Sequence, residues 1–197
     1  MPTARPLLVV VTGPSGAGKD SVLARMRSLG RPYHFAVNAT TRAPRESEVE
    51  GVDYYFVSED RFREMVEKGE LLEHAVVYGQ HKGVPKGPVI QALRSGKDVI
   101  VRADVQGARY IKSVAPGAVT IFVTAPSLPD LERRLTGRAT DSPQQIELRL
   151  GTARSEIEAA GEFDYVVVND DLDRCVAEVE AILARERGRP ERPPIDL

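Results

Sequence analysis

Short apolar runs rich in β-branched residues alternate along this chain with longer stretches in which apolar residues recur every three or four positions. Runs of this length are typical of buried strands, and the longer period is typical of amphipathic helices. The candidate core strands are residues 7–11, 35–37, 99–101, 119–123 and 165–169. Because strands that alternate with helices form mainly parallel sheets, the pattern predicts an α/β fold.

The segment between the second and third of these strands has a pattern of its own. It holds a polar loop over 38–51, an aromatic strand at 53–57, a helix from 58 to 69 and a strand at 71–78. The sequence then predicts a loop over 79–85 and a helix that ends near Gly96. We interpret this segment as an insertion between two units of the core.

A glycine-rich turn follows the first strand and leads into the first helical stretch. Its residues are Gly13-Pro14-Ser15-Gly16-Ala17-Gly18-Lys19-Asp20-Ser21. A strand, a G-x-x-x-x-G-K turn and a helix form the context in which backbone N–H groups bind phosphate. The glycines allow positive φ angles and a close approach to an anion, and Lys19 adds a mobile positive charge. The turn therefore predicts a nucleotide-binding site.

The residue after the lysine departs from this motif, because it is Asp20 where a serine or threonine is usual. A carboxylate is a good Mg²⁺ ligand, but it also stabilises a helix N-terminus by its charge alone. Asp104 raises a similar question after the strand over 99–101, since it could hold Mg²⁺ at the sheet edge or cap the next helix. Both interpretations stay open for both residues.

Several polar side chains of the insertion are candidates for contact with a second ligand. Arg42 and Arg45 lie on the polar loop, where a planar guanidinium suits bidentate contact with phosphate and Tyr54 could add a hydroxyl. The alternative is that both arginines are simply exposed to solvent and bind no phosphate. Glu73 stands among apolar residues, and a half-buried carboxylate needs partners. The N1–H and N2–H₂ groups of a guanine would satisfy it, and so would an internal arginine.

Further arginines surround a segment rich in helix-breaking residues. Arg133, Arg134 and Arg138 lie around the end of a predicted helix, and Arg149 lies in the long helix after the segment 137–143. Arginines that close over a transferring phosphoryl group can raise its rate by about 10³–10⁵. The pattern predicts a mobile lid, with a solvated charged face as the alternative.

The charge balance narrows the choice of partners. With 27 basic and 29 acidic residues the net charge is −2, which gives no sign of a general surface for nucleic acid or membranes. No apolar stretch approaches the length of a membrane span. The single cysteine, Cys175, falls on a helical apolar stripe and is expected in the core. We therefore expect a cytoplasmic protein.

Seven motifs are spread between about Leu7 and Arg187. They are G-P-S-G-A-G-K (13–19), T-T-R-A-P-R (40–45), G-V-D-Y-Y-F-V-S (51–58), L-L-E-H-A (71–75), D-V-Q-G-A (104–108), R-L-T-G-R (134–138) and V-V-V-N-D-D-L (166–172). The first is generic, whereas T-T-R-x-x-R together with G-x-D-Y-x-F is specific. Together the motifs resemble those of the guanylate kinases, a family of P-loop nucleoside monophosphate kinases.

The resemblance implies a fold as well as an activity. The fold is a five-stranded parallel P-loop core in three layers, with an inserted GMP-binding α+β subdomain and a short lid. The implied boundaries are 1–36, 96–136 and 146–187 for the core, 37–95 for the insertion, 137–145 for the lid and 188–197 for a flexible tail. The activity is transfer of the γ-phosphoryl group of ATP to GMP with Mg²⁺, by a chain that is a monomer or a homodimer.

The resemblance also implies a role for each acceptor-site candidate. Arg42, Arg45 and Tyr54 would hold the phosphate of GMP. Glu73 and Asp104 would read the guanine or support the metal ion.

The donor-site roles follow from the same resemblance. Lys19 would act with Arg134, Arg138 and Arg149 to stabilise the transferring phosphoryl group. Asn169 would lie near the adenine of ATP.

Other positions depart from the residues usual in the family. Lys82-Gly83-Val84 stands where Tyr-Gly-Ser or Tyr-Gly-Thr is expected. The charge of Lys82 could replace the tyrosine's phosphate contact, but Val84 cannot supply the hydrogen bond of a hydroxyl to the base. Asn38 replaces a usual serine and can still donate to guanine O6, and Arg102 occupies a position that is often acidic. These changes bear on GMP affinity and base selectivity more than on the reaction.

Two other functions remain alternatives. The sequence Gly-Lys-Asp-Ser resembles the loop of ribose 1,5-bisphosphate kinases, which share the P-loop fold and act on a sugar phosphate. A non-catalytic guanylate-kinase-like binding module is the second alternative. Such modules tend to have lost the P-loop lysine and the lid arginines, and this chain retains Lys19, Arg134 and Arg138.

Overall fold

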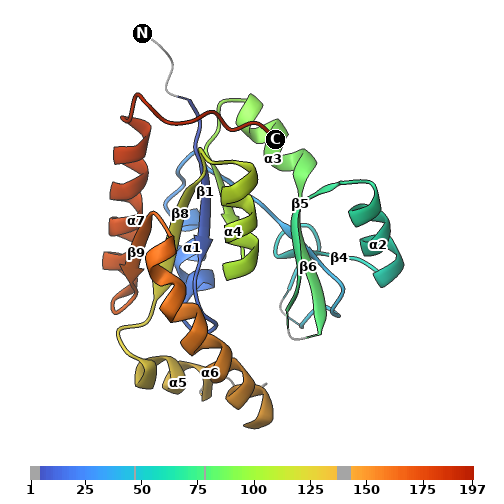
Figure 1. Ribbon diagram of the computed structural model, residues 1–197, viewed down its shortest axis with the longest axis vertical. Coiled ribbons are helices and arrows are strands. Elements are labelled where there is room, and N and C mark those ends of the chain that lie inside the picture. Colours follow the sequence, from blue (N-terminus) through green and yellow to red (C-terminus); the bar gives the residue numbers. More distant parts are fainter. Residues whose placement is uncertain (1–4, 47, 78, 137–142) are drawn as a thin grey trace.

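Two sheets of different size organise the chain (Figure 1). The structure is a computed structural model that describes residues 5–46, 48–77, 79–136 and 143–197. The larger sheet has five strands and the smaller has four. The chain begins in the larger sheet, passes through the smaller one and returns. This arrangement confirms the α/β fold and the insertion that the sequence predicts.

The larger sheet is parallel throughout. In spatial order its strands are β2 (His34–Phe35), β7 (Val99–Arg102), β1 (Leu8–Thr12), β8 (Val119–Thr124) and β9 (Tyr165–Val168). All five residues of the central strand β1 are buried. A parallel sheet covered on both faces needs such continuous apolar strands, which is why the five core strands could be predicted from short apolar runs.

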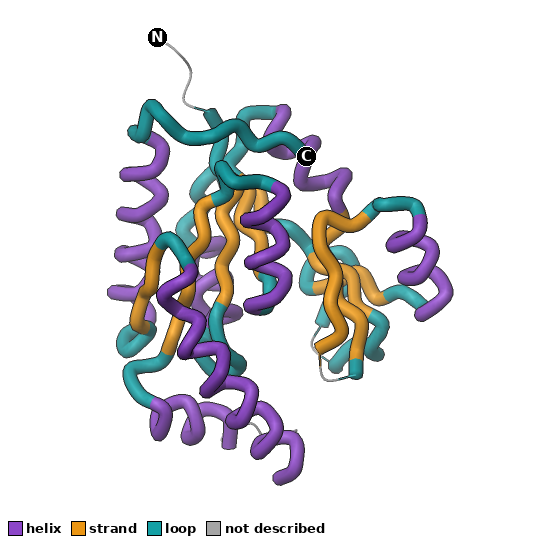
Figure 2. The backbone as a smooth tube through the Cα atoms, viewed as in Figure 1, coloured by secondary structure: helices purple, strands orange, loops and turns teal. Residues whose placement is uncertain are grey.

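Helices cover both faces of this sheet, giving three layers (Figure 2). α1 (Lys19–Ser28) and α7 (Leu172–Arg187) pack against one face. α3 (Lys86–Arg94) and α4 (Val105–Val114) contribute to the apolar cluster on the other face. Each face therefore has its own apolar core.

Two helices lie beyond the edge at which the parallel strands end, at the bottom of Figure 1. They are α5 (Leu128–Thr136) and α6 (Pro143–Glu158), and a 3₁₀ turn over Ala159–Glu162 follows. The predicted lid, 137–145, lies largely outside the described residues, which resume at residue 143. α5 and α6 thus flank the edge where a nucleotide-binding loop is expected.

The smaller sheet is mixed. In spatial order its strands are β4 (Tyr54–Phe56), β3 (Asn38–Thr40), β6 (Gln80–Pro85) and β5 (Leu71–Val77). Helix α2 (Glu59–Glu67) packs on it through a small apolar cluster formed by Ala39, Phe62 and Met65. The side chain of Ser58 caps this helix by accepting a hydrogen bond from the Arg61 N–H.

The strand β6 corrects one prediction, because the sequence indicates a loop over 79–85. In the structure this segment pairs antiparallel with both β5 and β3. Its apolar residue Val84 is buried, but a glycine and charged residues precede it, so the segment lacks a strand-like pattern. Pairing on both sides decides its conformation, as is common for strands of weak local preference.

The C-terminal segment 188–197 crosses the end of the larger sheet where β1 begins (Figure 1). The Arg192 guanidinium donates to the carbonyl oxygens of Arg5 at 2.7 Å and Pro6 at 3.1 Å. Ile195 and Leu197 are partly buried against the apolar cluster under α3 and α4. This packing differs from the flexible tail that the sequence predicts, because tail side chains find partners on the core.

Cys175 is buried and unbridged in the core, as predicted from its apolar stripe. Across the described part of the chain, no helix has both the length and the apolar character that a membrane span requires.

Candidate active site

A cleft of about 350 Å³ is lined by residues from both sheets. The predicted site residues that line it are Gly13, Ser15, Gly16, Gly18, Lys19, Asp20, Ser21, Asn38, Arg42, Arg45, Tyr54, Glu73, Lys82, Asp104 and Arg149. These residues come from distant parts of the sequence, and the fold brings them together. The cleft is therefore our candidate active site.

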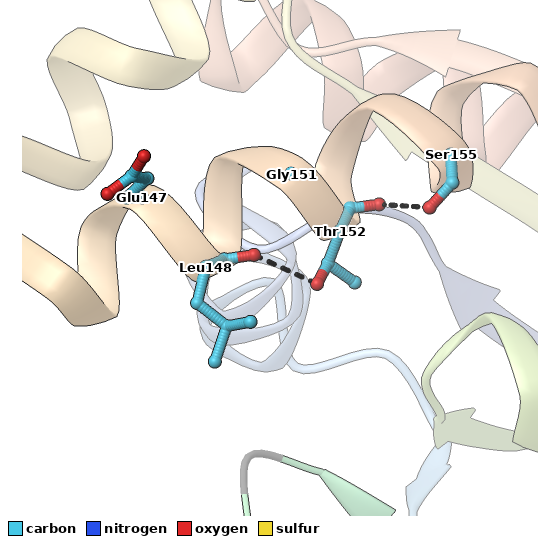
Figure 3. Close-up of a pocket in the computed structure, with 5 residues that line it drawn as sticks. All are labelled: Glu147, Leu148, Gly151, Thr152 and Ser155. Carbon is cyan, nitrogen blue, oxygen red and sulfur yellow. Dashed lines mark hydrogen bonds between the residues drawn. The ribbon is translucent and has the colours of Figure 1, made fainter.

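A second hollow, of about 660 Å³, runs along helix α6 (Figure 3). The described residues that line it are Glu147, Leu148, Gly151, Thr152 and Ser155. The Thr152 hydroxyl donates to the Leu148 carbonyl at 3.0 Å, and the Ser155 hydroxyl donates to the Thr152 carbonyl at 2.8 Å. Because both hydroxyls are bonded to their own helix, this hollow offers little for ligand recognition.

The glycine-rich turn between β1 and α1 has the backbone that the motif predicts. Gly13, Gly16 and Gly18 have φ angles of +130°, +87° and +88°. A Cβ atom at Gly13 would overlap the carbonyl oxygen of Val123, and one at Gly18 would overlap the amide of Asn169. The turn packs directly against neighbouring groups, so glycine is needed here for both conformation and space.

The Lys19 ammonium group folds back onto this turn. It donates to the carbonyl oxygens of Gly13 at 2.5 Å and Pro14 at 2.9 Å. The charge is thus held beside the turn in the ligand-free protein, at the position from which a lysine can reach phosphate.

Arg134 and Asn169 support the turn from behind and do not line the cleft. The Arg134 guanidinium donates to the carbonyl oxygens of Asn169 at 2.7 Å and Ala17 at 3.4 Å. The Asn169 amide donates to the Ala17 carbonyl at 2.8 Å. The predicted residues Pro14 and Ala17 are buried in the same region. Arg138 falls outside the described residues.

On the opposite wall, Glu48 organises the two arginines of the polar loop. Its carboxylate accepts two hydrogen bonds from the Arg42 guanidinium, at 2.6 and 2.5 Å. It also accepts one from the Arg45 backbone N–H at 2.8 Å. The bond from Arg42 lowers the pKa of Glu48, so the carboxylate stays ionised and keeps the Arg42 fork in a fixed orientation.

The Tyr54 ring lies between two guanidinium groups. The Cζ atoms of Arg42 and Arg102 are 4.9 and 4.8 Å from its centroid. Stacking of this kind restricts the guanidinium planes and favours their charge. The predicted group of Arg42, Arg45 and Tyr54 therefore includes a further arginine.

Glu73 is buried on β5, with an exposed fraction of 4%. Burial, with a smaller effect of the charge on Asp104, raises the pKa of Glu73 to about 8. Among the described residues no basic side chain forms an ion pair with it, so the internal arginine considered above is not found there. The carboxyl group is therefore suited to a ligand that supplies the hydrogen-bond donors.

Three other predicted residues lie around Glu73. The Asn38 side chain donates to the Arg102 carbonyl at 2.9 Å, which leaves its second N–H for a ligand. Asp104 caps α4, because its Oδ1 atom accepts a hydrogen bond from the Gly107 N–H at 2.7 Å. Burial, followed by the charges of Arg102 and Arg42, lowers the pKa of Lys82, for which the described residues provide no ion pair.

Sequence reasoning missed two charged residues of the cleft, Arg102 and Glu156. Arg102 was visible only as an unusual residue at the end of a strand. Glu156 lies on α6 beside apolar residues, and its position near the turn follows from the fold rather than from any local signal. Burial raises its pKa, while the charge of Lys19 opposes this effect.

The acidic side chains of the cleft determine how it could hold Mg²⁺. No group of three acidic, histidine or cysteine side chains within the described chain could enclose a metal ion. Asp104 uses one oxygen to cap its helix, whereas Asp20 forms an ion pair with Arg102. Mg²⁺ commonly binds through one or two carboxylates together with substrate phosphates, so Asp104 fits such a site better than Asp20 does.

The chain is similar to known proteins in both sequence and fold. The family model described as guanylate kinase matches residues 5–186. The guanylate kinase of Rhodococcus jostii is 46% identical over 187 residues, which cover 94% of this chain and 89% of the relative. That of Clostridioides difficile is 41% identical over 186 residues, which cover 94% and 91%. A crystal structure of guanylate kinase from Anaplasma phagocytophilum, 30% identical, has a TM-score of 0.79 and covers 95% of this chain and 89% of that one.

Proposed function

Since this chain belongs to the guanylate kinase family, we propose that it transfers the γ-phosphoryl group of ATP to GMP and forms ADP and GDP. The observation that carries the proposal is the cleft, which has a phosphate-binding turn on one wall. On the other wall it has the Arg42–Glu48 pair and the buried Glu73. An enzyme that transfers a phosphoryl group from one nucleotide to another needs a binding site for each of them, and the two walls provide these sites.

The donor half binds the triphosphate of ATP. The N–H groups of residues 13–21 and the N-terminus of α1 surround the β-phosphate, and Lys19 leaves its carbonyl partners to contact the phosphates. Arg134, Arg138 and Arg149 are our candidates for stabilising the charge on the transferring group. Asn169, behind the turn, is our candidate for the edge of the adenine site.

The acceptor half binds GMP. Arg42, Arg45 and Tyr54 take its phosphate, with Lys82 as an additional charge. The ionised Glu73 accepts the N1–H and N2–H₂ groups of the guanine, and Asn38 donates to O6. Val84 is fully buried and contributes no contact to the base.

We also propose Mg²⁺ as the cofactor that accompanies ATP, with Asp104 as the first candidate to hold it, directly or through water, and Asp20 as the second. The ion supplies charge neutralisation on the phosphates. The chain's own contribution is to orient the two nucleotides and exclude water.

The two substrates meet when the cleft closes. We propose that residues 37–95 act as the GMP-binding insertion and residues 137–145 as the lid. Such closure aligns the reacting groups and keeps water from the donor. Every residue assigned a role belongs to one chain, so either a monomer or a homodimer is compatible with the reaction. Both nucleotides occur in the cytoplasm, which is the proposed location.

The test is ADP formation from Mg-ATP with single acceptors: GMP, dGMP, IMP, AMP and ribose 1,5-bisphosphate. We expect strong preference for GMP over AMP, because adenine lacks the donors that Glu73 accepts. Activity with the sugar phosphate alone would replace the proposal by a sugar-phosphate kinase. Inactivity with every acceptor would favour the non-catalytic binding module.

A further inference from the structure

We propose that Arg102 is an additional ligand for the acceptor phosphate, and that the P-loop residue Asp20 holds its guanidinium while the cleft is empty. The inference rests on the function proposed above. It extends that function to two positions, 20 and 102, at which this chain departs from the residues usual in the family. It would make the acceptor site sensitive to a residue of the donor loop.

The first observation is the position of Arg102 between the two halves of the site. It ends β7, paired in register with Val11 of β1, and its carbonyl accepts the hydrogen bond from Asn38. Its side chain is 22% exposed and lies on the wall of the cleft. One nitrogen of its guanidinium bonds to the Asp20 carboxylate, which is 66% exposed in the first turn of α1.

The second observation is the resemblance between this pair and the Arg42–Glu48 pair. Each arginine is bonded to one carboxylate, and the two guanidinium groups contact the same Tyr54 ring. Arg42 is proposed to take the acceptor phosphate. Arg102 is equally close to the ring, and it has donors beyond the one that Asp20 uses.

The third observation is the balance of charge near the ring. The Arg102 guanidinium is a permanent cation, because arginine is not deprotonated in proteins, and with its side chain only 22% exposed it needs an anion beside it. Lys82, with its lowered pKa, is repelled by Arg102 and Arg42. A phosphate dianion would compensate the positive charge of these side chains. When the phosphate is absent, the Asp20 carboxylate compensates part of that charge.

Asp20 and the acceptor phosphate would thus compete for one guanidinium. Removing the Asp20 charge leaves Arg102 beside the Tyr54 ring and releases the donor that Asp20 engages, and it also removes a negative charge from the neighbourhood of the phosphate. Both effects favour GMP. This role differs from that of a metal ligand, which would influence Mg-ATP and leave GMP binding without metal unchanged.

The experiment measures GMP affinity by calorimetry in EDTA without ATP, for the wild type, Arg102→Gln, Asp20→Asn and the double variant. We expect Arg102→Gln to weaken GMP binding by about tenfold, as for loss of one charged hydrogen-bonding partner. Asp20→Asn should strengthen binding by about fivefold to tenfold in the wild-type background but by no more than about twofold in the Arg102→Gln background, since contacting residues are energetically coupled.

Three controls keep the test specific. Asp173→Asn removes the carboxylate of another α1 pair, Arg25–Asp173 at 2.7 Å, which does not line the cleft, and should leave GMP affinity unchanged. Affinity for an ATP analogue should be unaffected by Arg102→Gln. Arg102→Lys keeps the charge but loses the planar fork, so it should bind GMP with an affinity between those of the wild type and Arg102→Gln, and it tests the proposal if Arg102→Gln does not fold.

Equal effects of Asp20→Asn in both backgrounds would overturn the inference, and so would unchanged GMP affinity in Arg102→Gln. Unchanged GMP affinity in Asp20→Asn together with an altered Mg²⁺ requirement would instead identify Asp20 as a metal ligand. A wild-type protein that binds no GMP would contradict the proposed function itself.

Discussion

The two halves of the cleft are built in different ways. The donor half is formed by backbone: three glycines with positive φ angles connect a fully buried strand to a helix of the main core. The acceptor half is formed by side chains on a small sheet whose own apolar cluster, in the described part of the chain, has three buried residues, Ala39, Phe62 and Met65. Its geometry depends on ion pairs such as Arg42–Glu48.

This difference has consequences for what a mutation does. A change in the donor turn disturbs the core on which the turn is packed, so stability and ATP binding should fall together. A change in an acceptor side chain should alter affinity or selectivity for GMP while the fold persists.

Gly13→Ala should give the largest effect. A Cβ atom at this position meets the Val123 carbonyl, and the φ angle of +130° is unfavourable for alanine. We expect the free energy of unfolding to fall by about 3 kcal/mol or more, together with loss of ATP binding, as measured by urea denaturation. The matched control is Gly87→Ala, at an open position in α3, which should change stability by no more than about 1 kcal/mol. A stable Gly13→Ala protein would contradict the packing described for the turn.

Arg42→Ala should weaken the binding of GMP and leave that of ATP nearly unchanged. Loss of a charged hydrogen-bonding group costs about 1.5–3 kcal/mol, so the KM for GMP should rise by about 10- to 100-fold while the KM for ATP changes little. Arg61→Ala is the control, because Arg61 is another ion-paired arginine of the same subdomain, exposed on α2. An equal rise in the KM values of both substrates would remove Arg42 from the acceptor phosphate.

Glu73 should release a proton when GMP binds. Its pKa is raised from 4.5 to about 8 in the empty cleft, so the carboxyl is protonated at pH 7, whereas the guanine donors require the carboxylate. The affinity for GMP should therefore rise with pH up to about 8. Calorimetric titrations in two buffers of different ionisation enthalpy should give different heats for the wild type and equal heats for Glu73→Gln. Equal heats for the wild type would contradict this protonation state.

The same raised pKa has a consequence for stability. The folded empty protein binds a proton that the unfolded chain has already lost at neutral pH. The contribution of Glu73 to stability is complete below about pH 4.5 and is lost as the pH rises through about 8. Glu73→Gln should remove this dependence, which can be measured by thermal unfolding across that range.

The sequence predicted the donor half well because its determinants are local. The apolar runs identified five core strands, and the spacing of Gly13, Gly16, Gly18 and Lys19 identified the turn. The structure has positive φ angles at all three glycines. Each of these features depends on neighbours within a few residues, so no knowledge of the tertiary structure was needed.

The acceptor half was harder because its determinants are distant in the sequence. Strand β6 forms only through pairing on both sides, and its sequence resembles a loop. The Asp20–Arg102 pair joins residues 82 positions apart, so neither partner could be assigned from local pattern. The sequence left Asp20 open between a metal ligand and a charge that stabilises the helix N-terminus, and it gave no sign that Arg102 at the end of β7 lies beside Asp20.

Hydrogen exchange of the protein with single nucleotides tests the contrast most directly. GMP alone should slow exchange in peptides from residues 37–95, and a non-hydrolysable ATP analogue alone should slow exchange in residues 13–21, because each ligand stabilises the segment that it contacts. Protection of residues 13–18 by GMP alone, as strong as that of the small sheet, would contradict an acceptor site that is separate from the donor turn.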